Sequence, residues 1–183
     1  LLITQNVDRL HQRAGSKEVI DLHGRLDRVL CLDCRAGYQR DAIQRYLERL
    51  NPQHVGFKAQ ARPDGDADLS DEQVAGVKIV DCQACGGLLM PDVVFFGGSV
   101  PRARVEQCDN AIDRADALLV LGSSLQVYSG YRFCKRARQL NKPLYILNEG
   151  VTRADELATL KITHNALDQF LAAAEHINPS VNG

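Results

Sequence analysis

The sequence predicts an α/β fold, in which a parallel sheet carries helices on both faces and a small metal-binding module is attached. Three observations lead to this prediction. After residue 85, apolar runs of strand length alternate with helical patterns; polar residues follow the ends of these runs; and four cysteines form two CxxC pairs. The 183 residues suffice for one ordinary domain with a small satellite, whose core needs no disulfides.

The composition is that of an ordinary soluble protein. Hydrophobic residues make up 45% and charged residues 25% of the chain, and no apolar run is long enough to cross a bilayer. The 22 basic residues balance 23 acidic ones, so the net charge gives no attraction to nucleic acid or to a membrane surface. The first residues lack the pattern of a secretory signal, so secretion is not expected.

The first predicted element is a buried strand over residues 1–3. Because the chain has no Met at its start and begins within this strand, we expect an upstream segment to be missing. The carboxyl end of a strand is a typical place for a ligand site in α/β proteins. Here that end carries two amides and a carboxylate, in the side chains of Gln5, Asn6 and Asp8.

A histidine followed by glycine comes 15 residues after Asp8, at His23 and Gly24. The small neighbour permits another group to approach the backbone closely. A single histidine is usually structural, so the pair alone indicates little. We assign no role to the remaining histidines, His11, His54, His164 and His176.

Four of the six cysteines predict a structural zinc site. Two residues between thiolates let both sulfurs reach one ion from a tight turn, and two such turns complete a closed tetrahedral site. Scattered buried cysteines and a redox CxxC motif are the alternatives, but a redox motif would occur once. The predicted ligands are Cys31, Cys34, Cys82 and Cys85, and we expect the two cysteines without a CxxC partner, Cys108 and Cys134, to lie in the core.

The 47 residues between the two pairs differ in character from the rest. Residues 40–50 have helical spacing of apolar side chains and predict a surface helix. Residues 62–68 are polar and rich in Asp, which is superficially typical of a calcium loop. Counted from Asp64, however, Leu69 and Ala75 stand where such a loop needs Gly and Glu. We therefore predict a solvated acidic loop.

The remainder of the chain alternates strands and helices in the order of a nucleotide-binding α/β domain. The apolar composition of residues 117–121 and 143–147 predicts fully buried strands. The other expected elements are a short apolar run at 93–96 and helices at 101–115, 129–141 and 167–176.

Two polar motifs follow the two buried strands. Small Gly and Ser residues expose backbone N–H groups and hydroxyls that can hold phosphate or ribose oxygens, and an Asn amide can bind ribose hydroxyls. Each motif alone is more often a simple turn, and only their occurrence at adjacent strand ends favours a ligand. The motifs are Gly122-Ser123-Ser124 and Asn148-Glu149-Gly150.

Taken together, these motifs resemble the sirtuin (Sir2) family, in the order typical of its members. They are TQNVDRLHQRAG at 4–15, HG at 23–24, the CxxC pairs, PDVVFFG at 91–97, GSSLQVYSG at 122–130 and LNEG at 147–150. The insert and the strings around FFG and GSSLQVYSG are most similar to class II sirtuins. The resemblance implies a Rossmann-like domain over 1–27 and 90–178, incomplete at its first strand and cofactor loop, and a zinc module with a class II insert over 28–89.

The resemblance implies an NAD-dependent protein-lysine deacylase, which transfers the acyl group to ADP-ribose and releases nicotinamide. His23 would be the general base, and Asn6 and Asp8 would act beside it around the nicotinamide and its ribose. NAD would be the co-substrate and one Zn²⁺ structural. The implied cofactor-binding residues are Gln5, Asn6, Val7, Asp8, Gly122, Ser123, Ser124, Asn148, Glu149, Gly150 and, through its backbone, Ala166.

An acylated-lysine protein or peptide is the substrate that the resemblance implies. It would add as a strand between two segments, so that main-chain bonding gives affinity with little sequence preference. The implied contacts are Val94, Phe95, Phe96, Gly97, Leu125 and Val127. Core packing is the other interpretation of the two Phe residues. Gly98 stands where many sirtuins have an acidic residue, which leaves the peptide contacts there open.

The family's glycine-rich GAGxS loop would lie upstream of residue 1, so we expect this chain alone to be inactive. The alternative functions are a non-catalytic, zinc-containing peptide-binding module and protein ADP-ribosyl transfer. Zinc-ribbon binding of nucleic acid is disfavoured because no basic, aromatic-rich face is evident. We expect no membrane association, a monomer, and a bacterial cytoplasm, with the mitochondrial matrix as the alternative, because both compartments keep thiols reduced.

Overall fold

The computed structural model describes residues 1–56, 60–61 and 67–177. Most of the predicted acidic loop, residues 62–66, lies outside them. The chain forms two compact units, each built from discontinuous segments. Unit 1 comprises Leu1–Gln5, Lys17–Leu22 and the described residues from Gly97 onward, and unit 2 comprises Asn6–Ser16 and the described part of His23–Phe96. The implied Rossmann-like domain differs from unit 1 in residues 6–16, 23–27 and 90–96, which belong to unit 2.

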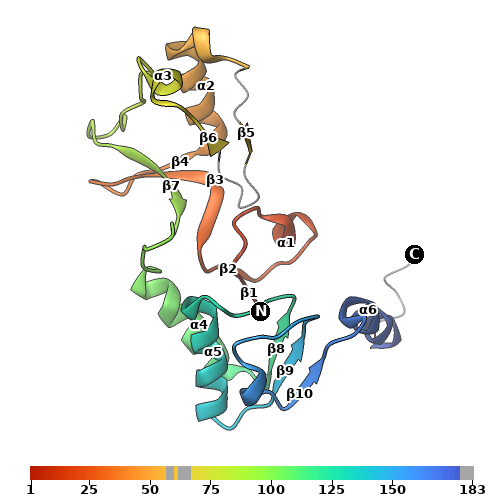
Figure 1. Cartoon of the computed structure of the whole chain (residues 1–183). Helices are drawn as coiled ribbons and strands as arrows, with labels where there is room; N and C mark the ends of the chain where they lie inside the picture. Colours follow the sequence, from red (N-terminus) through yellow and green to blue (C-terminus); the bar gives the residue numbers. More distant parts are fainter. Residues whose placement is uncertain (57–59, 62–66, 178–183) are drawn as a thin grey trace. The chain divides into compact units, whose positions relative to one another are not determined.

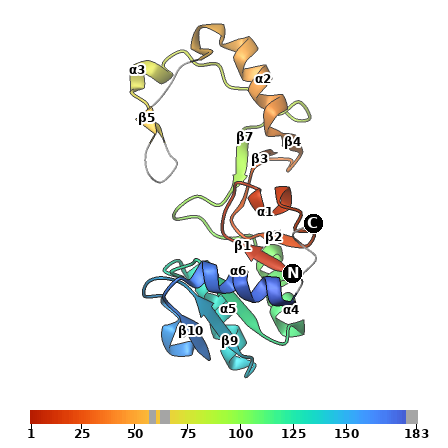
Figure 2. The ribbon, with the colours of Figure 1, turned by 90° about the vertical axis from the view of Figure 1, so that its right-hand side faces the viewer.

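Unit 1 is the α/β unit. Its strands run parallel in two sheets, β1–β2 and β10–β9–β8, which confirms the predicted parallel pairing. Helices α4 and α5 lie on one face of the β8–β10 sheet and α6 on the other (Figures 1 and 2). The elements are β1 (Leu2–Thr4), β2 (Val19–Asp21), α4 (Arg102–Arg114), β8 (Leu118–Leu121), α5 (Tyr128–Gln139), β9 (Leu144–Leu147), the 3-10 helix η2 (Asp155–Leu157), β10 (Leu160–Ile162) and α6 (Ala166–Ile177).

Two hydrophobic clusters hold unit 1 together. The first packs β8 and β9 against α5 and η2, with Leu144 and Ile146 at its centre. The second joins Leu22 to the inner faces of α4 and α5, through Cys108 and Phe133. Burial raises the pKa of the Cys108 thiol and of the Cys134 thiol to about 11, so both are inert core residues, as predicted.

Some strands of unit 1 are less buried than predicted. Only Val120 of β8 is buried, whereas Leu119 is 44% and Leu121 48% exposed. Among the described residues β8 is an edge strand, and these two side chains lie on its other face, so the prediction of a fully buried strand is wrong there. Leu1 is 66% exposed, so burial at the start of the chain is also less than expected. In strand β9 only Leu144 and Ile146 are buried, while Tyr145 and Leu147 are partly exposed, so the prediction of a fully buried strand is met on one face only.

Unit 2 is built around an antiparallel sheet in the order β4–β3–β7. Helix α2 covers it, and Ile43 of that helix meets Val29 and Val80 in a cluster of three buried residues. Helix α2 begins and ends where the sequence predicted. The elements are α1 (Leu10–Arg13), β3 (Gly24–Cys31), β4 (Gly37–Gln39), α2 (Arg40–Leu50), the 3-10 helix η1 (Pro52–His54), β5 (Gln60–Ala61), β6 (Ala67–Asp68), α3 (Asp71–Val74) and β7 (Leu89–Val93).

A buried asparagine fastens the carboxyl end of α2. Asn51 is 4% exposed, and its amide nitrogen donates to the carbonyl oxygens of Leu47 and Lys78, both at 2.8 Å. Its amide oxygen accepts from the Lys78 backbone N–H at 2.7 Å. Because every polar atom of the amide has a partner, hydrogen bonds offset the desolvation that its burial requires. The helix is thereby tied to the chain that leads to the second CxxC pair.

Candidate functional site

The four predicted metal ligands converge in unit 2. Their sulfur atoms lie within 4.8 Å of one another, with Cys31 and Cys85 at 3.5 Å and Cys34 and Cys82 at 3.6 Å. None of the four forms a disulfide. Tetrahedral Zn²⁺ with bonds of about 2.3 Å places its sulfurs about 3.8 Å apart. The cysteine cluster is therefore consistent with one structural zinc ion.

The two CxxC turns have the same local geometry. The Arg35 N–H donates to the Cys31 carbonyl oxygen at 3.2 Å, and the Gly86 N–H donates to the Cys82 carbonyl oxygen at 2.8 Å. Arg35 and Gly86 both have left-handed backbones, with φ of 62° and 75°. Each turn thus closes at the residue after its second cysteine, and this closure directs both sulfurs to one side.

A tyrosine contacts the cluster from β4. The Tyr38 hydroxyl lies 3.1 Å from the Cys82 Sγ. In the absence of an ion, this hydrogen bond lowers the pKa of the Cys82 thiol to about 6, which favours the thiolate that binds metal. Sequence reasoning missed this contact, because β4 was not predicted and a lone Tyr carries no spacing signal.

The predicted catalytic residues also lie in unit 2, on the segments that flank the start of β3. The His23 carbonyl oxygen accepts from the Val94 N–H at 2.8 Å, and the Val7 carbonyl oxygen accepts from the Leu26 N–H at 3.0 Å. The segment 94–96 is therefore hydrogen-bonded to His23 itself, and the segment 6–8 is hydrogen-bonded to Leu26, three residues further along. The Asp8 Oδ1 accepts from the Leu10 N–H at 2.9 Å, so one carboxylate oxygen fixes the start of α1.

Gly24 explains why glycine follows the histidine. Its φ is +91°, and a Cβ at this position would collide with the Asp92 carbonyl oxygen and come within 3.0 Å of the Val93 Cα. The close approach that the His-Gly pair predicted is thus made by β7, whose Val93 is the register partner of Gly24. This contact holds His23 beside the segment that follows β7.

The two Phe residues after β7 are exposed. Phe96 is 94% and Phe95 53% exposed, and Val94 is half-buried. Core packing is therefore the wrong interpretation of Phe96, because its ring has almost no protein contact in this structure. Exposed aromatic rings carry a large apolar surface, and such a surface suits an apolar ligand.

In unit 1, the GSS motif forms the loop after β8. Gly122 has a left-handed φ of 57°, and its N–H donates to the Leu147 carbonyl oxygen at 3.0 Å. The Gln5 amide donates to the Ser123 Oγ at 3.2 Å, so two of the predicted cofactor residues lie together. Leu125 is 5% exposed in the first core cluster, which leaves its backbone as the group that can meet a peptide. Val127 is half exposed, at 50%.

Arg153 holds this loop from the other side. Its backbone N–H donates to the Ser124 carbonyl oxygen at 2.9 Å, and its guanidinium donates to the Gln126 carbonyl oxygen at 3.0 Å. The guanidinium also lies over two rings of α5, 4.6 Å from the Tyr131 centroid and 5.7 Å from that of Tyr128. Sequence reasoning missed Arg153 as well, because an isolated Arg after a predicted strand gives no pattern.

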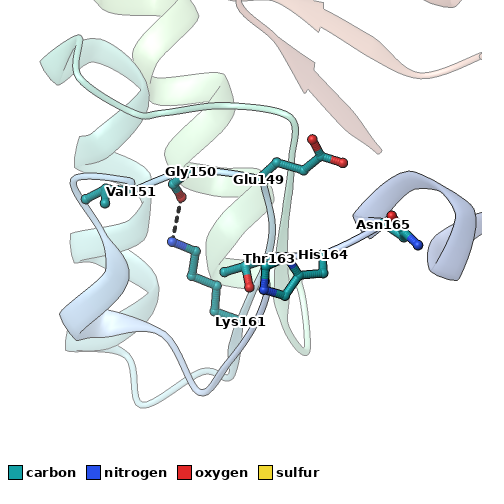
Figure 3. A pocket seen from close by; sticks show the side chains of 7 residues that line it. All are labelled: Glu149, Gly150, Val151, Lys161, Thr163, His164 and Asn165. Atoms are coloured by element: carbon teal, nitrogen blue, oxygen red, sulfur yellow. Dashed lines mark hydrogen bonds between the residues drawn. The ribbon is translucent and has the colours of Figure 1, made fainter.

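A pocket of about 470 Å³ lies at the carboxyl ends of β9 and β10 in unit 1 (Figure 3). Its size falls within the range of small-molecule sites. Glu149 and Gly150 were predicted, whereas the residues after β10 were missed because that strand was not recognised. The lining residues are Glu149, Gly150, Val151, Lys161, Thr163, His164 and Asn165.

Lys161 lines this pocket and hydrogen-bonds to the turn beside it. Its Nζ donates to the Gly150 carbonyl oxygen and to the Asp155 carboxylate, both at 2.7 Å. The Asn148 amide also donates to the Gly150 carbonyl oxygen, at 3.2 Å. These bonds fix the turn after β9, while the Glu149 side chain is exposed. Ala166, the remaining predicted residue, is the first of α6.

The fold of unit 1 is of the α/β type that binds nucleotides. The cysteine cluster makes unit 2 a module of the type that binds zinc. The Sir2 family model matches residues 1–129, and the chain belongs to the Sir2 family. The chain is similar to an "NAD-dependent protein deacetylase" of Bordetella bronchiseptica, with 50% identity over 94% of this chain and 62% of that protein. It is likewise similar to one of Xanthomonas axonopodis pv. citri, with 51% identity over 97% of this chain and 61% of that protein.

Solved structures of Sir2 proteins have the same fold. One, with a p53 peptide and NAD+, superposes with a TM-score of 0.71 at 31% identity, over 97% of this chain and 63% of that one. Another, bound to an acetylated peptide, has a TM-score of 0.70 at 30% identity, over 97% of this chain and 63% of that one. The chain thus spans less than two thirds of the length of these relatives. Among the residues the structure describes, helices long and apolar enough to span a membrane are absent.

Proposed function

We propose that the chain carries most of the active site of an NAD-dependent protein-lysine deacylase. The observation that carries the proposal is the hydrogen bonding around β3, which gathers the segments of Asn6, Asp8, His23 and Phe95 in one unit. Those segments bear the residues to which the family resemblance gives the base, the nicotinamide contacts and the acyl-lysine contacts. The relatives named as deacetylases add support.

In the proposed reaction, NAD supplies an ADP-ribose acceptor for the acyl group when it is bound. His23 removes a proton from a ribose hydroxyl, for which its imidazole must be neutral near the working pH. Asn6 and Asp8 orient the nicotinamide end. The rings of Phe95 and Phe96 enclose the aliphatic lysine side chain, which buries apolar surface on both partners.

The residues of unit 1 suit the adenosine half of NAD. The left-handed Gly122 leaves the GSS loop free of side-chain bulk at its first position, and Ser123 offers a hydroxyl for phosphate or ribose. In the pocket after β9, the exposed Glu149 carboxylate can accept from ribose hydroxyls. The backbone at Ala166 borders the adenine. The protein substrate adds as a strand beside the backbone of Leu125–Val127.

A bacterial cytoplasm is the proposed location. The named relatives are bacterial. The four cysteines lie close enough together to bind one metal ion, and a reducing compartment favours metal binding over disulfide formation.

The test is NAD-dependent release of nicotinamide from a panel of acyl-lysine peptides, with the peptide product weighed by mass spectrometry. A peptide that loses its acyl group supports deacylation, and one that gains an ADP-ribose mass indicates ADP-ribosyl transfer instead. The chain is assayed as given and also extended with the part of the Bordetella relative that it does not match. We expect turnover only from the extended form. Among the described strands, β1 pairs only with β2 and β8 only with β9, so each leaves one edge of its sheet open for a further strand.

The His23→Ala variant of the extended form identifies the base. We expect at least a hundredfold loss of turnover, the usual contribution of a general base being about 10²–10⁴-fold. His11→Ala in the same unit is the matched control and should retain activity. Unchanged deacylation by His23→Ala would eliminate the proposed base. Folded, zinc-loaded protein that binds peptide without any turnover would favour the non-catalytic binding module.

A further inference from the structure

Tyr38 contacts two features of unit 2 at once, a hydrophobic cluster and the cysteine cluster. Its ring packs against the small cluster formed by Val29, Ile43 and Val80, while its hydroxyl lies 3.1 Å from the Cys82 Sγ. Its place in the sheet is fixed, because β4 pairs with β3 and sets Tyr38 opposite Val29. The hydroxyl therefore cannot leave the sulfur without disturbing either the sheet or the cluster.

The chemistry of a four-thiolate site determines which atom donates. Four thiolates on one Zn²⁺ leave an excess of two negative charges, so hydrogen-bond donors to the sulfurs stabilise the bound state. A metal-bound thiolate has no proton to give, whereas a tyrosine hydroxyl keeps its proton at neutral pH. With zinc bound, the hydrogen bond must therefore run from the Tyr38 hydroxyl to the Cys82 sulfur.

We propose that Tyr38 is a positioning residue of the zinc site, which holds the Cys82 thiolate by a hydrogen bond and couples metal binding to the packing of helix α2. Among the residues described for unit 2, the hydrophobic cluster has three buried members with a few partly buried side chains packed on it, a core too small to hold a module of this size by hydrophobic burial alone. Zinc supplies folding free energy in such modules, and Tyr38 links that energy to the cluster that α2 covers. The inference rests on the zinc site and is independent of the proposed deacylase activity.

The test uses the 183-residue chain and its Tyr38→Phe variant, which keeps the ring and removes only the hydroxyl. The matched control is Tyr46→Phe on α2, whose ring is 40% exposed and lies under Arg49 rather than beside a sulfur. Zinc content is measured first. Zinc release to a chromogenic chelator is then followed, and the absorption spectrum of each chain is recorded with Co²⁺ in place of zinc.

We expect Tyr38→Phe to release zinc about tenfold faster than the wild type, the lower end of the effect of losing an outer partner of a metal ligand. Its sulfur-to-cobalt charge-transfer band should move to longer wavelength, because a hydrogen bond lowers the energy of the sulfur lone pair. Tyr46→Phe should match the wild type in both measurements. A Tyr38→Phe chain with wild-type release and an unshifted band would overturn the inference.

A second variant covers the case in which Tyr38→Phe does not fold. A fluorinated tyrosine placed at position 38 keeps the ring and is a stronger donor, so the cobalt band should move to shorter wavelength than in the wild type. An unshifted band would overturn the role of Tyr38. A wild-type chain that takes up neither Zn²⁺ nor Co²⁺ would overturn the zinc site and, with it, the inference.

Discussion

Replacing Gly24 by Ala tests whether close packing of two strands positions His23. The added Cβ would collide with the Asp92 carbonyl oxygen and would lie 2.8 Å from its carbon and 3.0 Å from the Val93 Cα. The carbonyl oxygen makes the closest approach, so strand β7 would have to withdraw there by roughly 1.5 Å to restore ordinary contact at about 3.5 Å. That movement stretches the hydrogen bond from the Val94 N–H to the His23 carbonyl oxygen.

The magnitude follows from two costs. A left-handed backbone strains an L-residue by about 1 kcal/mol, and overpacking of a tight contact costs about 1–3 kcal/mol more. We therefore expect Gly24→Ala to lower the free energy of unfolding by about 3 kcal/mol. Gly76→Ala is the matched control, because Gly76 has a φ of +78° and a Cβ added there would meet no atom within 4 Å. It should cost only the strain of about 1 kcal/mol.

The assay is thermal unfolding of the zinc-loaded variants, followed by circular dichroism. The difference of about 2 kcal/mol corresponds to about 4–8 °C for a chain of this length. Gly24→Ala should also abolish deacylation in the extended form, whereas Gly76→Ala should not. If both variants unfold at the same temperature, β7 does not press on Gly24 and the explanation of the His-Gly pair fails.

Three further outcomes follow from the structure. Removing zinc with a chelator should unfold most of unit 2 and reduce the helical circular dichroism, because structural Zn²⁺ contributes on the order of 10 kcal/mol in small modules; retention of the full signal would contradict this. The hydrogen-bonded Arg136 guanidinium holds the pKa of the Asp113 carboxyl below its ordinary value of 3.8. The stabilisation is therefore fully present above about pH 3.8 and is lost as the pH falls through the folded-state pKa, so the decrease in unfolding temperature caused by Asp113→Asn should be largest at pH 7 and should shrink as the pH is lowered below 3.8. Arg153→Gln should destabilise unit 1 by about 1–2 kcal/mol in denaturant unfolding. The control Arg132→Gln, which loses a ring contact at 5.7 Å, should cost at most about half as much. Equal losses of stability would refute the role of Arg153.

The four longer helices and the metal ligands could be predicted from the sequence because their signals are local, whereas the four-residue helices α1 and α3 were missed. Helix α2 coincides with the predicted range, and α4, α5 and α6 differ from theirs by only a few residues at their ends. The CxxC spacing likewise depends only on neighbouring residues. Hydrophobic periodicity and ligand spacing need no knowledge of the tertiary fold.

The strands of unit 2 could not be predicted, because their side chains do not alternate. Strand β3 has Arg25, Leu26, Asp27 and Arg28 in succession, and Leu26 is 51% exposed. Pairing with β4 and β7 defines this strand, and such pairing is not visible locally. The residues that Arg153 and Tyr38 contact are likewise distant in sequence and meet only in the folded chain, so no sequence motif predicts these contacts.

The metal cluster also bears on how this chain tolerates change. The 47 residues between Cys34 and Cys82 form a segment whose two ends both lie at the same group of four sulfurs. The entropic cost of closing such a segment rises by only about 0.6 kcal/mol for each doubling of its length, so its length is weakly constrained. Evolution can lengthen, shorten or exchange this segment while the ion keeps its two ends together. The segment between the two CxxC pairs is therefore the part of the chain whose length can change with little effect on the metal site.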